Sequence, residues 1–213
     1  MSVNVNKRSR GRPREFELEV AIQVGQDLFH EHGYENVSVA ALTEAIGITA
    51  PSFYTAFGSK GAFFLDALKR YSATVVPLDR FLTPGKLPAT ALGEMLIAAA
   101  RAYAAHPQRR GCFILEHAKA GTTEWGIAAA QIAGENRDKV LAFLKASDIP
   151  APAQVLDYVA VTMLGLSAAA REGWEKERLI AVAENSAAGL DHVIWRDHVS
   201  PEASQPRVQA SPM

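Results

Sequence analysis

The stretch that decides the fold is SVAALTEAIGITAPSFYTAFGSK, residues 38–60. It predicts two short helices joined by a tight turn. Ser38 can cap the first helix, and Gly47 lies where that helix should end, because glycine adopts the left-handed conformation of a C-terminal cap at little cost. Thr49 can cap the second helix, and Pro51 fits its first turn, where a missing N–H is tolerated. This order of caps is typical of a helix-turn-helix, which lays its second helix in the major groove of DNA.

The second of these helices has an apolar side and a side of small or hydroxyl-bearing residues. Phe53 and Phe57 lie four residues apart, so both should pack inward. Ser59 can cap a further helix, whose first turn carries Lys60 beside backbone N–H groups that attract phosphate. The alternative is a compact three-helix packing unit with no role in DNA binding. The expected DNA contacts are Thr49, Ala50, Ser52 and Thr55 at or near base edges, Tyr54 and Lys60 at the phosphate backbone, and Ser38.

A basic arm, KRSRGRPR at residues 7–14, precedes the first helix. Five of its eight residues are cationic, so it should be disordered until it meets an anion. Its inner part resembles the core of an AT-hook, an extended peptide that inserts arginines into a narrow, electronegative minor groove. We expect Arg10 and Arg12 to lie in the minor groove beside the recognition helix, with Arg14 adding a further DNA contact. The alternative is an ordinary solvated tail.

Residues 10–71 carry a spaced set of motifs. These are Gly11-Arg12-Pro13-Arg14, Leu28-Phe29, Gly33-Tyr34, Ser38-Val39, Ile46-Gly47-Ile48-Thr49, Ser52-Phe53-Tyr54, Phe57 and Gly58-Ser59-Lys60. This part of the chain resembles the N-terminal domain of the TetR family of bacterial transcriptional regulators. The resemblance implies an all-helical homodimer whose C-terminal domain binds a ligand that releases the protein from an operator. Gly25 and Gly61 depart from the family pattern, and each should cost up to about 1 kcal/mol of helix stability.

Composition agrees with an all-α protein of two domains. The chain has 213 residues, of which 48% are hydrophobic, and a net charge of −1. Such a balance argues against a histone-like coating of DNA and favours a localised footprint. We expect an N-terminal three-helix helix-turn-helix DNA-binding domain and a C-terminal helical ligand-binding and dimerisation domain. The expected bounds are a disordered arm at 1–14, the DNA-binding domain at 15–76, the ligand-binding and dimerisation domain at 77–197, and a disordered tail at 198–213.

The remaining helices are expected at 17–31, 60–75, 88–105, 111–120, 123–147, 151–173 and 175–197, with residues 77–88 as a connection. The chain shows no signal peptide pattern and no apolar run of membrane-spanning length. The single cysteine, Cys112, excludes an internal disulfide framework, which is consistent with the cytoplasm. No Walker loop, dinucleotide fingerprint, nucleophile elbow or HExxH motif is present, so we expect neither an enzyme nor a cofactor.

The last two long helices predict a homodimer interface. Each carries an apolar stripe, and a two-fold dimer would read a palindrome with two recognition helices. The alternative is that these stripes meet only the domain's own core. The residues expected at the interface are Val159, Met163, Leu166, Val182, Ser186, Leu190 and Val193.

The effector site is less clearly marked. Cys112 follows Arg109-Arg110 at an expected helix start, an arrangement that favours thiolate and therefore a redox or electrophile sensor. The alternatives are a buried structural cysteine, a metal site using His106, Cys112, Glu116 and His117, and an apolar pocket. The residues named for ligand binding or sensing are Met95, Tyr103, Cys112, Phe113, His117, Trp125 and Phe143. The sequence as a whole predicts a DNA-binding repressor without a membrane partner, and the alternative function is a helical interaction protein that binds no DNA.

Overall fold

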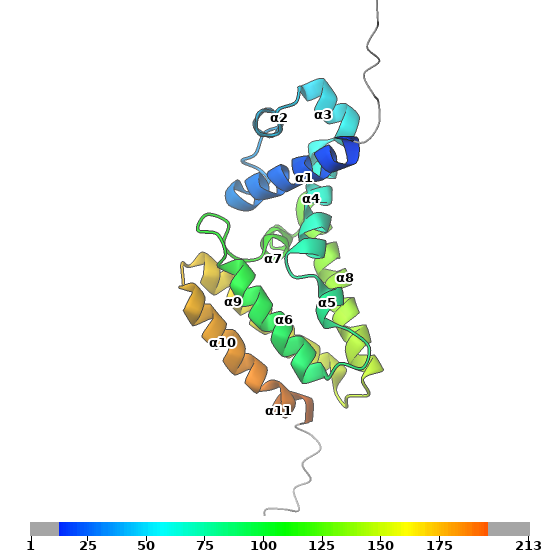
Figure 1. Ribbon diagram of the computed structural model, residues 1–213, viewed down its shortest axis with the longest axis vertical. Helices are drawn as coiled ribbons and strands as arrows, with labels where there is room; N and C mark the ends of the chain where they lie inside the picture. Colours follow the sequence, from blue (N-terminus) through cyan, green and yellow to red (C-terminus); the bar gives the residue numbers. More distant parts are fainter. Residues whose placement is uncertain (1–12, 196–213) are drawn as a thin grey trace, which may run out of the picture. The chain divides into compact units, whose positions relative to one another are not determined.

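The computed structural model describes residues 13–195, and side chains from Leu18 onward. This part of the chain is helical and contains no strand, so the predicted all-α class is confirmed. The helices are α1 (Pro13–His32), α2 (Val39–Ile46), α3 (Ala50–Phe57), α4 (Lys60–Thr74), α5 (Leu78–Phe81), α6 (Pro88–Tyr103), α7 (Phe113–Ala118), α8 (Glu124–Ala146), α9 (Pro152–Arg171), α10 (Lys176–Ala188) and α11 (Leu190–Trp195) (Figure 1).

The helices form two compact units. Of the described residues, the first unit contains those up to Pro77 and the segment Ala102–Glu135. The second unit contains Leu78–Arg101 and the described residues from Asn136 onward. The chain therefore passes between the units three times, twice within a helix (α6 and α8). No pattern in the sequence indicated that residues 102–135 group with the helix-turn-helix.

An aromatic cluster forms the core of the first unit. Phe29 of α1, Phe53 of α3, and Phe63 and Phe64 of α4 are each at most 1% exposed. The ring centroids of Phe53 and Phe63 lie 5.1 Å apart, and those of Phe29 and Phe64 lie 5.0 Å apart. These edge-to-face contacts tie three helices to one another, which fixes how α3 is held on α1 and α4.

Gly25 is required by this core rather than merely tolerated in α1. A Cβ atom at Gly25 would lie 2.1 Å from Cε1 of Phe63. The Phe63 ring cannot move aside, because Phe29, Phe53 and Phe57 surround it. The departure from the family pattern at this position is therefore explained by the close approach of α4.

We expect Gly25→Ala to lower the free energy of unfolding by about 1–3 kcal/mol, because overpacking outweighs the helix propensity gained. Urea unfolding measures the change. Gly134→Ala is the matched control, since nothing lies within 4 Å of a Cβ there and the variant should gain up to about 1 kcal/mol. In a Phe63→Ala background the cost of Gly25→Ala should vanish. Equal destabilisation by Gly25→Ala in both backgrounds would contradict this explanation.

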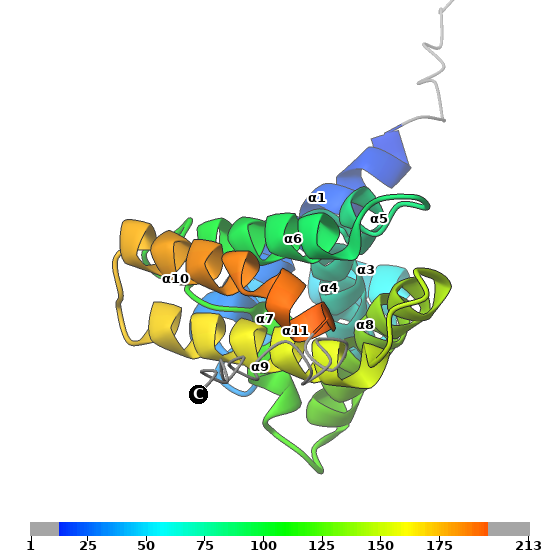
Figure 2. The same cartoon turned by 90° about the horizontal axis from the view of Figure 1, so that it is seen from below.

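In the second unit, α10 and α11 run alongside α9 (Figure 2). Val155, Val159 and Leu166 of α9 are buried, as are Leu179 and Ala183 of α10. Leu190 and Ile194 of α11 are also buried. These side chains form a core between α9, α10 and α11.

Three boundaries differ from the sequence expectation. The helix expected at 175–197 is divided at Gly189, where the Tyr158 hydroxyl donates a hydrogen bond of 3.0 Å to the Ser186 carbonyl. That carbonyl would otherwise accept a bond within a continuous helix. The expected connection at 77–88 contains the short helix α5. Helix α1 begins at Pro13, so Arg14 belongs to its first turn rather than to the arm, as proline at a helix start permits.

Three of the seven residues predicted at the interface are buried in the single chain. Val159, Leu166 and Leu190 are 0–3% exposed in the single chain, because their side of the helix pair meets the unit's own core. The structure leaves Met163, Val182, Ser186 and Val193 at least partly exposed. The large apolar side chains most exposed on α9 are instead Val161 (68%) and Leu164 (45%).

Helix α9 also contradicts the expectation that no apolar run reaches membrane-spanning length. The helix has 20 residues, and an 18-residue window within it has a mean hydropathy of 1.4, which would suffice by length and composition alone. The apolarity has two origins, a buried face against α10 and α11 and a second, exposed face that includes Val161 and Leu164. A helix with two apolar faces needs two surfaces to cover it.

Candidate nucleic-acid interface

The caps predicted for the helix-turn-helix are confirmed. The Ser38 hydroxyl accepts a 3.1 Å bond from the Ala41 N–H at the start of α2. Gly47 ends that helix with φ 78°, in the left-handed region. The Thr49 hydroxyl accepts from the Ser52 N–H at 3.4 Å and so caps α3, which is separated from the end of α2 by three residues. Local hydrogen bonds therefore fix the angle between α2 and α3.

One side of α3 is buried in the core and the opposite side is exposed. Phe53 and Phe57 point into the core, at 0% and 8% exposure, as predicted. With about 3.6 residues per turn, the opposite side of α3 centres on Pro51, Ser52 and Thr55, all of which are exposed. The helix therefore presents a surface that a flat or grooved partner can reach.

The hydroxyl groups on this exposed side are already hydrogen-bonded within the motif. Thr49 Oγ1 and Ser52 Oγ lie 2.9 Å apart, and one of them donates to the other. Thr55 Oγ1 donates to the Pro51 carbonyl at 2.8 Å. Tyr54, at the flank of this side, is 52% exposed.

Lys60 lies in the first turn of α4, directly after the Ser59 cap. Its Nζ atom lies 4.1 Å from the centre of the Tyr34 ring. Desolvation lowers the pKa of Lys60, while the nearby Glu35 carboxylate acts to raise it. From Ser38 to Ser59 the sequence has no Lys or Arg, so Lys60 is the cation that follows the motif most closely.

The first turn of α8 meets the start of α4 within the first unit. The Trp125 ring stacks on Tyr34 with centroids 4.6 Å apart. A Cβ atom at Gly61 would lie 3.4 Å from Oε1 of Glu124. Glu124 therefore brings an acidic group to the start of α4, where the helix dipole favours negative charge.

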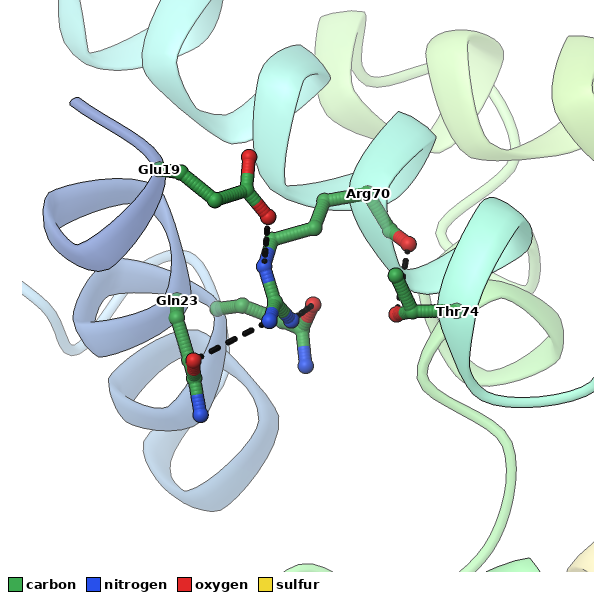
Figure 3. A network of polar contacts seen from close by, with 5 residues as sticks. Glu19, Gln23, Arg70 and Thr74 are labelled. Carbon is green, nitrogen blue, oxygen red and sulfur yellow. Dashed lines mark hydrogen bonds and ion pairs between the residues drawn. The ribbon is translucent and has the colours of Figure 1, made fainter. Parts of the chain in front are cut away.

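Arg70 joins α4 to α1 through three side-chain acceptors (Figure 3). Its Nε donates to Glu19 Oε1 at 2.7 Å, and its two terminal nitrogens donate to Gln26 Oε1 at 2.9 Å and Gln23 Oε1 at 3.0 Å. The three acceptors line one side of α1. Sequence reasoning missed this hydrogen-bond network, although the polar residues Glu19, Gln23 and Gln26 recur at helical spacing on one side of α1. The network strengthens the packing of α1 against α4, the two helices that form the platform on which α3 is held.

The arginines predicted to enter the minor groove cannot be placed. Arg10 and Arg12 lie outside the described residues. The side chain of Arg14 also lies outside them, although its backbone belongs to α1. Their roles stay predictions.

The sensor interpretation of Cys112 does not match its surroundings. The side chain is 6% exposed, and burial raises the pKa of the thiol despite hydrogen bonds that act to lower it. The sequence pattern predicted the opposite shift. A buried, protonated thiol reacts slowly, so the structure favours a small core residue at this position.

His117, on α7, is buried in the core of the same unit as Cys112. Its ring packs between Phe64 and Phe113, with centroids at 4.9 and 4.7 Å. Nδ1 lies 2.9 Å from the Phe113 carbonyl, so this nitrogen carries the proton and donates it. Burial lowers the pKa of His117, and the bond to Phe113 offsets part of that effect.

Acidification should therefore destabilise the protein through His117. Below about pH 6.5 the unfolded chain binds a proton that the folded chain excludes, so the free energy of unfolding falls as the pH drops toward the folded pKa. The slope from this one proton has an upper limit of about 1.4 kcal/mol per pH unit. Urea titrations at several pH values should show a flatter dependence in His117→Gln, whereas the exposed His192→Gln should resemble the wild type. The same slope in all three proteins would contradict this role.

The residues named for ligand binding fall into separate groups. Tyr103, Cys112, Phe113 and His117 lie in the core of the first unit, and Trp125 contacts Tyr34 in the same unit. Met95, which is buried, and Phe143, which is half-buried, belong to the second unit.

The structure does not bring together the described residues of the metal site considered as an alternative. In the described residues no group of three or more His, Cys, Asp or Glu side chains is arranged to hold a metal ion. Three of the four candidates have other partners. His106 accepts from the Gln108 N–H, Glu116 pairs with Lys119 at 2.9 Å, and His117 donates to a carbonyl.

Comparison with known proteins agrees with this geometry. Residues 21–67 match the model of the bacterial regulatory proteins, tetR family. The HTH-type transcriptional repressor BdcR of Escherichia coli (strain K12) is 36% identical over 192 residues, covering 88% of this chain and 97% of that protein. The chain belongs to the TetR family. It is thus a helix-turn-helix transcriptional regulator, as the sequence motifs predicted.

Further similarities extend over most of this TetR-family chain. The HTH-type transcriptional repressor ComR of the same organism is 29% identical over 195 residues, covering 83% of this chain and 90% of that protein. A cysteine mutant of the TetR family regulator CifR, solved with a 26-base-pair double-strand operator DNA, is 28% identical with a TM-score of 0.69. That alignment covers 85% of this chain and 98% of CifR. The similarity therefore includes both the helix-turn-helix and the C-terminal helices.

Proposed function

We propose that this TetR-family protein represses transcription in the cytoplasm by occupying a palindromic operator as a homodimer, and that it has no catalytic role. The observation that carries the proposal is the exposed side of α3, centred on Pro51, Ser52 and Thr55, on a platform fixed by aromatic packing and Arg70. A helix of this kind fits the major groove. The repressor names of BdcR and ComR and the operator complex of CifR support it.

The homodimer is proposed from the exposed face of α9 and α10. Val161, Leu164 and Val182 expose large apolar side chains, and nothing lies within 4 Å of a Cβ at Gly165. A second copy packed there would cover this face. The 8 residues of α3 can contact only a few base pairs. A dimer would place two copies of α3 on two half-sites and so recognise a longer sequence.

Release from the operator is proposed to follow binding of a small ligand. A ligand would act by changing the separation of the two recognition helices, because a mismatch with the groove spacing loses contacts at both half-sites. Modification of Cys112 is the second candidate signal, and burial of that thiol argues against it.

An electrophoretic mobility shift assay tests the proposal. The probe is the DNA immediately upstream of the protein's own gene, searched for an inverted repeat. Retention that is sequence-selective and sensitive to salt supports a DNA-binding regulator. Absence of any retained fragment at low salt would instead favour the helical interaction protein.

Lys60 should contribute affinity without specificity. We expect Lys60→Ala to weaken binding to all DNA sequences about equally and to reduce the slope of log affinity against log salt by about one for each half-site. Fluorescence anisotropy at several salt concentrations measures both quantities. Lys69→Ala removes the same charge from an exposed position further along α4 and should leave the slope unchanged. A change in which operator is preferred would show that Lys60 contacts bases.

A further inference from the structure

The side-chain groups on the exposed side of α3 limit which base pairs it can read. Between Ser38 and Ser59 the sequence contains no Arg, Lys, Asn, Gln or His. Those are the side chains that recognise guanine or adenine through paired hydrogen bonds in the major groove. The charged residue in this range, Glu44, lies on α2, the helix that crosses the backbone in this motif.

The hydroxyl groups on the exposed side of α3 have few protons left to donate to base edges. Thr49 and Ser52 share one hydrogen bond, which uses one of their two protons. The Thr55 proton is used by the Pro51 carbonyl. A base edge that approaches the centre of α3 therefore meets one free hydroxyl proton and several oxygen lone pairs, too few donors for purine recognition.

Apolar groups dominate the same surface. The Pro51 ring and the Thr55 methyl group lie on the side of α3 opposite Phe53 and Phe57, and the Ala56 methyl lies at its flank. In the major groove the apolar group of the bases is the thymine C5-methyl, which contacts alanine and threonine methyl groups. Because these side chains are short, the backbone of α3 can approach the base edges closely.

We infer that α3 recognises its operator chiefly by contact with thymine methyl groups, with Thr55 and Pro51 as the specificity-determining residues. The inference rests on the proposed function and names the class of half-site that the regulator selects. It also assigns the Thr55 methyl group, rather than the hydroxyl, to readout. The hydroxyl would then serve to hold the Thr55 side chain in place through the Pro51 carbonyl.

Methyl deletion in the DNA tests this directly. The full-length protein first selects its operator from random duplexes. Each deoxythymidine of one half-site is then replaced singly by deoxyuridine, which removes the methyl group and keeps every hydrogen-bonding group. We expect a loss of about fourfold in affinity at two or more positions, the effect of one buried methyl group.

A matched pair of protein variants separates methyl from hydroxyl. Thr55→Val keeps a β-branched methyl side chain and should bind within about twofold of wild type. Thr55→Ser keeps the hydroxyl and should lose about fourfold, and it should no longer respond to deoxyuridine at one position. Thermal unfolding checks that both variants fold.

The outcomes are distinct. If no duplex is retained, the proposed function fails and the inference with it. If DNA is retained but no deoxyuridine position weakens binding, only the inference fails. It also fails if Thr55→Ser binds like wild type while Thr55→Val does not, since that result assigns readout to the hydroxyl.

Discussion

Replacing Leu164 with glutamate should convert the proposed homodimer to a monomer and weaken operator binding by about 10²-fold or more. Leu164 is 45% exposed on α9, close to Val161 and the open position at Gly165. A carboxylate there would be buried without a partner in the dimer, which costs several kcal/mol. Loss of the second half-site then removes the advantage of linked binding, typically 10²–10⁴-fold.

Sedimentation and operator titration measure the two parts of this effect. Ile127→Glu is the matched control, because Ile127 is also a large exposed apolar residue, at 57%, but lies on α8 in the first unit. It should leave the oligomeric state unchanged. If Leu164→Glu stays dimeric, the interface is not this face of α9; if it is monomeric and still binds the whole operator tightly, two-fold recognition is wrong.

The largest loss of stability should come from Phe63→Ala. Phe63 is 0% exposed and lies 4.4 Å from Phe57 and 5.1 Å from Phe53, measured between ring centroids. Truncating such a side chain leaves a cavity and costs about 3–5 kcal/mol, a large part of the stability of a small domain. Because Phe53 and Phe57 are the buried residues of α3, the recognition helix should also lose its fixed orientation.

Urea unfolding measures this cost, and operator titration below the transition measures the loss of orientation. Tyr54→Ala serves as the control for the urea measurement alone, because Tyr54 is 52% exposed and its truncation should change stability by no more than about 0.5 kcal/mol. A cost below about 1 kcal/mol for Phe63→Ala would mean that the aromatic cluster does not hold α3 in place.

The helix-turn-helix could be predicted from the sequence in detail, because its caps are local. Ser38, Gly47, Thr49 and Ser59 each act within a few residues of their position, so spacing alone identifies them. The inward pair Phe53 and Phe57 follows from helical periodicity in the same way.

The features that the sequence did not reveal depend on long-range packing. Val159 and Leu166 have the spacing of an apolar stripe, but only the position of α10 and α11 decides which stripe of α9 is inside. The pKa of Cys112 likewise depends on burial rather than on the neighbouring arginines. By helix propensity Gly25 is unfavourable in α1, and only its close approach to Phe63 explains why a glycine is needed there.

The hydrogen-bond network of Arg70 determines how ionic strength affects the packing of α1 against α4 in this regulator. Two of its three acceptors, Gln23 and Gln26, are neutral amides, and the side chain of the third, Glu19, is 57% exposed. Dissolved ions weaken attraction between exposed charges but leave amide contacts nearly intact. The packing of α1 against α4, and with it the position of α3, should thus persist from low to high salt concentration. The dependence of operator affinity on salt would then report the number of phosphates that the protein contacts.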